Sequence, residues 1–388
     1  MFFRSRLAIL LSVSFLSVSA HVALAEISIG GTFNSPGFDD QPTTTIENKL
    51  IEMIDLAAPR SSIQMSMYTF KRMPITLALL RAQSRGVRIE LILDGKNKEL
   101  EDKKGSPVHV LLKGTSDLAP LRCGTHSCVT FCGGILGGSC RGIVNNHNKF
   151  FLFSELQDGR KNVVALSSAN FEEGMFHMYN DLLVLAGDTA LFEGVQNYFN
   201  GLRNPFAKVP LQIRGQSAVI YTFPNQKYDP TLEILKQVQC HLPDSKIRIT
   251  QSRFTDERLA IAKELLKLSQ LGCQIQVITR EEPLMQSPGL KVKATLRSLM
   301  QILPYKGHSK KAKNSNHSKT IAIDASFQGS AQKVQMVLTG SHNLNTNSLK
   351  NNDELQIQII HPAVYKAYSH FFDQMLEEAQ SVGYLGPF

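Results

Sequence analysis

The chain of 388 residues contains no tryptophan, and beyond an apolar stretch at residues 7–18 it has no apolar run long enough to cross a membrane. A spanning helix needs about 20 consecutive apolar residues, so we expect no transmembrane segment in the rest of the chain. Acidic residues are also few, with 33 Asp and Glu against 42 Lys and Arg, a formal charge of +9. This balance favours anionic partners, either nucleic acid or an anionic membrane surface.

The N-terminal residues 1–25 have the composition of a secretory signal. Arg4 and Arg6 provide a basic start, residues 7–18 are apolar, and a small-residue cleavage site ends at Ala25. Cleavage would leave about 363 residues, enough for two domains, with a charge of +9 − 2 = +7. The alternative is an N-terminal anchor that stays attached. We expect a secreted or periplasmic protein, cleaved after about Ala25.

Four of the six cysteines gather in a glycine-rich stretch: Cys123, Cys128, Cys132 and Cys140. Export favours disulfides, and four cysteines allow three pairings between which the sequence does not choose. A zinc site that includes His126 is the alternative, although the spacing lacks the paired C-x2-C knuckles of zinc ribbons. Cys240 and Cys273 either pair or are buried singly. We expect the clustered cysteines to have a structural role.

Two short patterns recur in the same order along the chain. The upstream copy is His147-Asn-Lys149 with Ser167-Ser168-Ala-Asn170, and the downstream copy is His317-Ser-Lys319 and Asp324 with Gly340-Ser341-His-Asn343. The histidine precedes the asparagine by 23 residues in the first copy and by 26 in the second. Each copy offers an imidazole, an ammonium group and a carboxamide, and we know of no packing reason for this set to occur twice.

The similarity extends upstream of these patterns. Residues 75–85 and 259–271 have helical apolar spacing and are followed by Gly86 and Gly272, which we interpret as helix C-terminal caps. Apolar β-branched runs then predict buried strands. Residues 63–70 parallel residues 247–254, and Thr32-Phe33 and Thr222-Phe223 mark a first strand in each half. A repeat of this length indicates a duplicated domain.

The pattern H-x-K-x4-D followed by G-S-x-N resembles the phospholipase D superfamily, specifically its secreted bacterial members with two such motifs in one chain. The resemblance covers residues 27–385. The second motif is complete, whereas in the first Ser154 stands at the aspartate position and Ser167 at the glycine position. This departure puts the structural role of the aspartate in doubt in the first half.

The resemblance implies an α/β fold of two similar halves, each a mixed β-sheet flanked by helices, packed with pseudo-twofold symmetry around one active site. We place the first half at residues 26–200, a connector with the first strand of the second half at 201–230, and the second half at 231–388. Because both motifs lie in one chain, a monomer suffices.

The resemblance also implies residue roles. His147 attacks phosphorus to form a phosphohistidine, and His317 acts as acid and then base. The phosphate oxygens are neutralised by Lys149, Lys319, Asn170 and Asn343, and Ser168 and Ser341 line the phosphate pocket. Asp181 and Glu354, each eleven residues after its asparagine, hold the opposite nitrogen of a catalytic imidazole. Asp324 completes the catalytic motif by orienting its loop. Two ammonium groups replace a metal, so we expect no metal and no cofactor.

Other candidates receive structural roles. Met65, Met67 and Tyr68 lie on an expected core strand and are assigned to packing. Of the remaining histidines only His342 neighbours a motif residue closely enough to be placed near the pocket.

The favoured function is a phospholipase D-type hydrolase that releases phospholipid head groups, with peripheral contact to a membrane. One alternative is a secreted, metal-independent endonuclease, favoured by the lysines that precede the second motif: Lys306, Lys310, Lys311 and Lys313. The other is an inactive protein that binds anionic polymers, motivated by Ser154. The head group, the choice between hydrolysis and transfer to an alcohol, and the choice between periplasm and exterior stay open at this stage.

Overall fold

The computed structural model describes residues 27–36, 42–121, 128–133, 137–204, 206–303 and 315–381. The signal segment 1–25, Cys123, His126 and the lysines at 306, 310, 311 and 313 lie outside the described residues, so the predictions made for them stay predictions.

The first half alternates strands and helices before it ends in three antiparallel strands and a long helix. Its elements are β1 (Ser28–Asn34), α1 (Thr45–Asp55), β2 (Ser62–Met67), α2 (Met73–Ser84), β3 (Arg88–Leu93), α3 (Pro107–Lys113), β4 (Val129–Phe131), β5 (Lys149–Glu155), β6 (Lys161–Ser167), β7 (Met178–Ala186) and α4 (Thr189–Arg203).

The second half repeats this order. Its elements are β8 (Gln212–Arg214), β9 (Ala218–Phe223), α5 (Pro230–Leu235), β10 (Val238–Gln239), β11 (Lys246–Gln251), α6 (Leu259–Gln270), β12 (Gln274–Arg280), α7 (Leu290–Thr295), β13 (Met300–Leu303), β14 (Ser315–Asn316), β15 (Lys319–Phe327), β16 (Val334–Gly340), β17 (Glu354–Ile360) and α8 (Pro362–Ser381).

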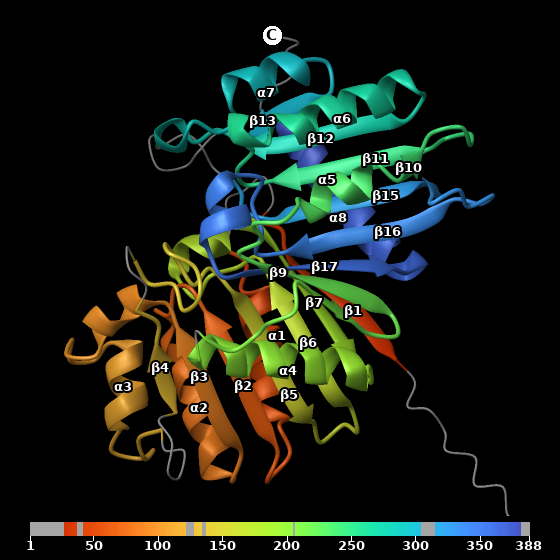
Figure 1. The fold of residues 1–388 in the computed structure, drawn as a ribbon. Coiled ribbons are helices and arrows are strands. Elements are labelled where there is room, and N and C mark those ends of the chain that lie inside the picture. Colours follow the sequence, from red (N-terminus) through yellow and green to blue (C-terminus); the bar gives the residue numbers. More distant parts are fainter. Residues whose placement is uncertain are drawn as a thin grey trace, which may run out of the picture.

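The two mixed sheets have matching strand orders. The first runs β1-β7-β6-β5-β2-β3-β4, and the second runs β13-β12-β11-β15-β16-β17-β9-β8. Read from the opposite end, the second sheet repeats the first, with β9 in the place of β1 and β8 added at its edge. In both sheets the strands that follow α2 and α6 pair in parallel with the strands that precede those helices. The two sheets form the two lobes of the molecule in Figure 1. This is the duplicated α/β fold that the sequence predicted.

Helices cover both faces of each sheet. On α1, Ile46, Leu50, Met53 and Ile54 are buried at helical spacing, which turns one apolar stripe of the helix toward the sheet. Helices α2 and α6 both end before a glycine with positive φ, 87° at Gly86 and 102° at Gly272, so the predicted caps are confirmed.

A separate apolar core joins the halves. It contains α4 residues such as Phe199 and α8 residues such as Tyr368, packed with side chains from both sheets, including Phe150 and Ile357. A polar bond also crosses this boundary, because the Asp181 carboxylate on β7 accepts bonds from the hydroxyls of Thr339 on β16 and Tyr368 on α8. Burial of apolar surface therefore fixes how the two halves pack, and it also fixes the relative positions of the residues at their interface.

The segments that precede the two motifs cross into the opposite half. Strand β14, which leads to His317, pairs with β7 of the first half. Asn146, which leads to His147, bridges Asp353 just before β17 of the second half. Each motif histidine is thereby delivered to the strand end of the other half.

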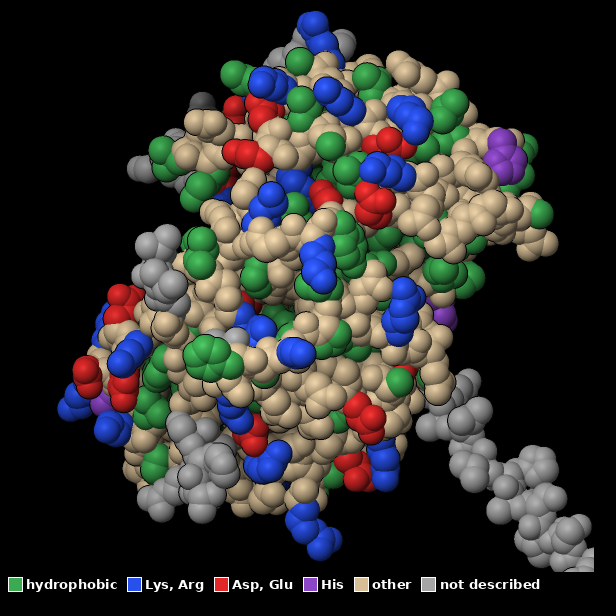
Figure 2. Space-filling model, viewed as in Figure 1, with side chains coloured by type: hydrophobic (Ala, Val, Ile, Leu, Met, Phe, Trp, Pro, Cys, Tyr) green, Lys and Arg blue, Asp and Glu red, His purple; other side chains and the backbone are tan. Residues whose placement is uncertain are grey.

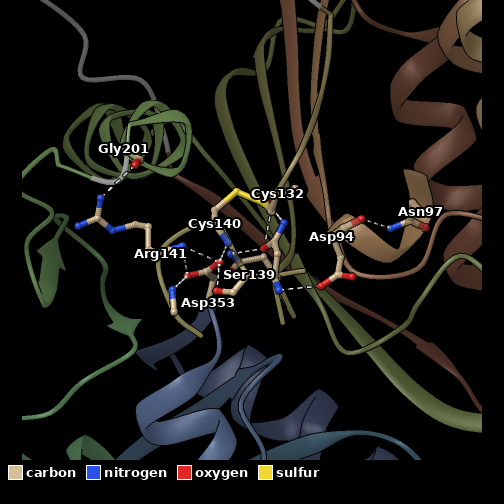
Figure 3. Close-up of a disulfide and its surroundings, with 12 residues drawn as sticks. Asp94, Asn97, Cys132, Ser139, Cys140, Arg141, Gly201 and Asp353 are labelled. Atoms are coloured by element: carbon tan, nitrogen blue, oxygen red, sulfur yellow. Dashed lines mark hydrogen bonds between the residues drawn. A yellow bond between two sulfur atoms is a disulfide. The ribbon is translucent and has the colours of Figure 1, made fainter. Parts of the chain in front are cut away.

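Disulfides support this arrangement. Cys132 pairs with Cys140, and Cys240 with Cys273, while Cys128 is also disulfide-bonded. The loop that contains Cys140 surrounds the Asp353 carboxylate, which accepts from Ser139 Oγ at 2.8 Å and from the Gly142 N–H at 2.9 Å (Figure 3). Disulfides are typical of proteins outside the cytoplasm. In the described part of the chain, every helix is too short or too polar to cross a membrane.

Candidate active site

A cavity of about 460 Å³ opens between the two halves. Both motif histidines lie on its wall, together with Asn170 and Asn343 from the loops that follow β6 and β16. The structure therefore brings the four residues together, although His147 and His317 are 170 positions apart in the sequence. This convergence makes the cavity the candidate active site.

His147 faces a carboxylate from the second half. Its Nδ1 lies 3.0 Å from Glu354 Oε2, although the ring N–H does not point squarely at that oxygen. The opposite nitrogen, Nε2, is left for the cavity. Burial lowers the pKa of His147 to about 4, with Glu354 opposing the shift. Burial would raise the pKa of Glu354, but His147 and Lys149 lower it to about 2. At neutral pH the pair is a neutral imidazole beside a carboxylate.

His317 faces an amide rather than a carboxylate. Its Nδ1 lies 3.0 Å from Asn180 Oδ1. The Asn180 Nδ2 group donates to the carbonyl oxygens of Met175 and Met178, so Oδ1 is the atom turned toward the ring. Because Asn180 Oδ1 can only accept, this contact places a proton on His317 Nδ1 and leaves Nε2 to face the cavity. Lys319 Nζ also lies 3.2 Å from His317 Nδ1, and in this tautomer it donates to the His317 carbonyl oxygen instead of to the ring. Burial, together with the charges of Lys319 and Arg280, holds the pKa of His317 well below its ordinary value.

The prediction for Asp181 was wrong. This residue does not contact His317; its carboxylate is buried and bonded to Thr339 and Tyr368. Burial raises its pKa. The strand register explains the error: Ser168 N donates to Asp181 O, whereas Ser341 N donates to Leu355 O. The structural counterpart of Glu354 is therefore Asn180, not Asp181.

The mismatch comes from a one-residue difference in loop length. The second half carries a π-helical turn at Asn347–Asn351, where the first half has a 3-10 turn at Glu173–His177. A π turn takes up one residue more than an α turn and is often found at functional sites. The residues eleven positions after Asn170 and Asn343, Asp181 and Glu354, are consequently not structural counterparts of each other.

The two lysines lie beneath the histidines. Lys149 Nζ donates to the carbonyl oxygen of His147 at 2.8 Å, and Lys319 Nζ donates to that of His317. Both side chains are almost fully buried. Burial lowers the pKa of Lys149 to about 7 and that of Lys319 well below its ordinary value. Two amino groups are thus held under the cavity floor, and a phosphate anion above them would favour their charged forms.

The serines of the two motifs do not line the cavity. Ser168 Oγ donates to Asn180 Oδ1 at 3.2 Å and accepts from the backbone of Asp181. Ser341 Oγ accepts from the backbone of Leu355 at 3.3 Å. The expectation that they contact phosphate is corrected: both fasten the loop to the neighbouring strand, and Ser168 also orients Asn180.

The aspartate of the second motif is remote from the cavity. Asp324 lies five residues beyond Lys319 on β15, which corresponds to roughly 17 Å along a strand. Its carboxylate binds Lys333 Nζ at 3.1 Å across the β15–β16 hairpin. Ser154, at the same position in the first half, accepts from Ser62 N at 2.8 Å. Asp324 is therefore not in the catalytic machinery, and Ser154, at the corresponding place on β5, does not line the cavity either.

Sequence reasoning missed several residues of the cavity wall. Tyr68, assigned to packing, lines the cavity with its ring 4.9 Å from that of His147, and Lys96 Nζ lies 2.9 Å from the Tyr68 ring centroid. On the other side Glu282 accepts from both Arg253 and Arg280 at 2.8 Å. The signal was present in the repeat, since all of these residues end or follow the parallel strands, whose carboxyl ends lie at one edge of each sheet. His342 is not on the wall; it stacks on Phe223 at 3.9 Å.

One group among the described residues has the spacing of a metal site: Cys132, Cys140 and Asp353. Its two sulfur atoms are joined to each other, and the carboxylate of Asp353 is occupied by four donors of the adjoining loop. The donor set therefore does not suit a metal while the disulfide is intact.

Comparisons with known proteins agree with this duplication. A family model described as "Cardiolipin synthase, PLD-like domain" matches residues 50–203 and again residues 237–376. A search of the curated proteins found no match. The solved structure of phosphatidylserine synthase from Haemophilus influenzae Rd KW20 is similar, with a TM-score of 0.56 and 12% identity over 91% of this chain and 86% of that chain. Polyphosphate kinase from Porphyromonas gingivalis has a TM-score of 0.50 and 12% identity over 90% of this chain, which spans only 50% of the kinase. At these identities the likeness to both enzymes is one of fold.

Proposed function

We propose that this chain, which belongs to the phospholipase D superfamily, hydrolyses phosphodiesters through a covalent phosphohistidine. The observation that carries the proposal is the pair of buried histidines from opposite halves in one cavity. In each, Nδ1 is held by a residue of the other half, so that Nε2 is available to substrate. If the two Nε2 atoms lie on opposite sides of a phosphorus atom, one can attack phosphorus while the other protonates the leaving oxygen, which is the geometry of an in-line displacement.

In the first step His147 Nε2 attacks phosphorus. A nitrogen–phosphorus bond forms while the bond from phosphorus to the leaving alcohol oxygen breaks, and His317 gives its Nε2 proton to that oxygen. In the second step His317 removes a proton from water, the water oxygen bonds to phosphorus, and the nitrogen–phosphorus bond breaks. The products are an alcohol and a phosphomonoester. The ammonium groups of Lys149 and Lys319 balance the charge on the non-bridging oxygens, and the two asparagines donate hydrogen bonds to them.

The unequal partners of the two histidines support this order. Phosphorylation of His147 places positive charge on its ring, which the Glu354 carboxylate at 3.0 Å stabilises. His317 must release and recover a proton, and the neutral Asn180 amide fixes its ring without holding that proton. A neutral free His317 gains its proton when the substrate anion enters the cavity and raises its pKa.

In-line geometry also divides the cavity. The leaving alcohol lies opposite His147, on the His317 side, where Arg280, Arg253 and Glu282 form the wall. The retained substituents of phosphorus lie in the plane perpendicular to this axis, and we assign the organic one to the part of the cavity wall that carries Tyr68 and Lys96. Recognition of the leaving head group therefore falls to the arginine–glutamate wall.

For the substrate we propose a phospholipid, with release of its head group and formation of phosphatidate. The family model and the phosphatidylserine synthase neighbour both carry names of phospholipid enzymes. The second candidate is an endonuclease, favoured by the charge of +9. On the face shown in Figure 2, the Lys and Arg side chains of the described residues are scattered over both lobes among acidic ones, without a continuous basic stripe. The remote position of Ser154 removes the motive for an inactive binding protein.

Turnover tests the proposal directly. Purified protein in EDTA is given phospholipid vesicles, single-stranded DNA and double-stranded DNA in parallel, with the His147→Ala and His317→Ala variants. His370→Ala, an exposed histidine away from the cavity, is the matched control. We expect head-group release that both cavity variants lose and the control keeps. DNA cleavage with the same pattern would favour the nuclease, and full activity of His147→Ala would overturn the mechanism.

The covalent intermediate has its own test. We expect His317→Ala to accumulate a phosphorylated peptide containing His147 with a substrate whose leaving group needs no proton, such as a p-nitrophenyl phosphodiester. Mass spectrometry at alkaline pH detects it. A phosphorylated His317 peptide in His147→Ala, and none on His147, would reverse the two roles.

A further inference from the structure

A short loop beside the cavity carries large apolar side chains in contact with water. Leu284 is 83% exposed, Met285 50% and Leu290 80%, whereas most leucines among the described residues are buried. Leu284 and Met285 lie in the loop between β12 and α7, and Leu290 is the first residue of α7. Clustered apolar exposure of this kind marks an interaction surface more often than chance.

The loop is held in shape at its base. Glu282 N donates to Ser287 O at 2.7 Å, Ser287 N donates back to Glu282 O at 3.2 Å, and the Ser287 hydroxyl accepts from Phe254 N. Leu284 and Met285 therefore sit at the tip of a closed turn that projects them outward. The equivalent segment of the first half, Gly95–Leu100, carries lysines and glutamate and buries its leucine. The fold consequently does not require an apolar tip here.

The tip adjoins the reaction. Glu282 lines the cavity and binds Arg253 and Arg280, on the side assigned to the leaving group. Leu284 follows it by two residues, so the two α-carbons lie within roughly 7 Å of each other along the chain. If the tip bound to another surface, the molecules of that surface would lie next to the opening of the cavity.

Basic side chains flank the apolar ones. Lys291 and Arg297 are exposed around α7, and Lys293 is partly exposed. Three acidic groups share the surface: Glu281, 4.0 Å from Lys293, Glu257, and the partly exposed Asp256. The balance is three cations against three anions, with apolar side chains between them. Apolar residues that enter the acyl boundary, with Lys and Arg at head-group level, are the pattern of peripheral membrane binding.

We propose that residues 283–297 dock the enzyme on a phospholipid bilayer that contains anionic lipids, with Leu284, Met285 and Leu290 inserted and Lys291 and Arg297 on the head groups. This proposal rests on the proposed function, which it deepens by assigning a bilayer as the form in which substrate arrives. Docked in this way, the cavity draws its phosphodiester from the surface beneath it.

The absence of tryptophan from the chain makes the insertion measurable. Leu284→Trp introduces a single indole at the tip, and Leu271→Trp, at a site 59% exposed on the C-terminus of α6, is the matched control. Both are made in the His147→Ala background, so that lipid is not consumed. With phosphatidylglycerol–phosphatidylethanolamine vesicles, we expect a blue shift of the Leu284→Trp emission and none for the control. Equal behaviour of the two would overturn the proposed orientation.

Affinity provides the second test. In vesicle sedimentation, Leu284→Ser/Leu290→Ser is expected to bind at least tenfold more weakly, and Lys291→Ala and Arg297→Ala about fivefold each. The matched control Leu271→Ser/Ile360→Ser changes two other exposed apolar residues and should bind like the wild type. Unchanged binding of the tip variant would refute the docking surface.

A soluble substrate separates the two proposals. The tip variant should keep wild-type turnover of a short-chain phospholipid below its micellar concentration and lose it on vesicles. Turnover of the soluble lipid without vesicle binding by the wild type refutes the docking surface alone. Vesicle binding without turnover of any phosphodiester refutes the proposed function and leaves the surface standing.

Discussion

Replacement of Glu354 by glutamine provides the sharpest test of the active-site geometry. Glu354 Oε2 lies 3.0 Å from His147 Nδ1, and both groups are buried. When His147 is phosphorylated its ring becomes cationic. Two unit charges at that distance attract by about 5 kcal/mol at an effective dielectric constant of 20. Glutamine keeps a neutral acceptor worth about 1 kcal/mol, so the loss is about 3–4 kcal/mol, or roughly 10²–10³ in kcat.

The matched control is Asp181→Asn. Sequence counting gave Asp181 the same role as Glu354, but its carboxylate contacts Thr339 and Tyr368 instead of a histidine. We expect its kcat on a soluble phosphodiester to fall less than about tenfold, with the main effect on thermal stability. A loss in Asp181→Asn equal to that in Glu354→Gln, with an unchanged intermediate level in both, would refute the assignment of partners.

Four further outcomes follow from the same geometry. First, Asn180→Asp places a carboxylate beside His317 and raises the pKa of that histidine, so the alkaline limb of the kcat/KM profile should move to higher pH. In the wild type, the alkaline limb of kcat/KM should lie at lower pH than that of kcat, because bound phosphate raises the pKa of His317. Second, the pKa of Lys149 falls from 10.5 to about 7 on folding, so its charge opposes folding fully below pH 7 and less as pH rises toward 10.5. Lys149→Met should therefore abolish turnover yet increase the free energy of unfolding at pH 6 by roughly 1–3 kcal/mol, measured in urea. Third, removal of the Cys240–Cys273 disulfide, which closes a separation of 33 residues, should cost about 2–4 kcal/mol of stability without loss of kcat. Fourth, EDTA should leave turnover unchanged, and full inhibition that zinc reverses would contradict the lysine-based mechanism.

The duplication and four residues of the cavity could be predicted from the amino-acid sequence alone. The period of the motifs, the glycines that cap α2 and α6, and the apolar strands were enough to place two α/β halves, because each of these signals is local. The residues His147, His317, Asn170 and Asn343 were found in the same way, since a short chemical pattern occurs twice at similar spacing.

The tertiary structure decided the partners of those residues. Whether Asn180 or Asp181 meets His317 depends on strand register, and register changed with one extra residue in the π turn at Asn347–Asn351. Asp324 lies outside the site because it is five residues beyond Lys319 on the same strand, and each residue of a strand adds about 3.3 Å of distance from the cavity. The wall of Tyr68 and Arg280 arises only when two sheets meet at their strand ends. These are non-local distances, fixed by the apolar core between the halves, and a linear pattern does not contain them.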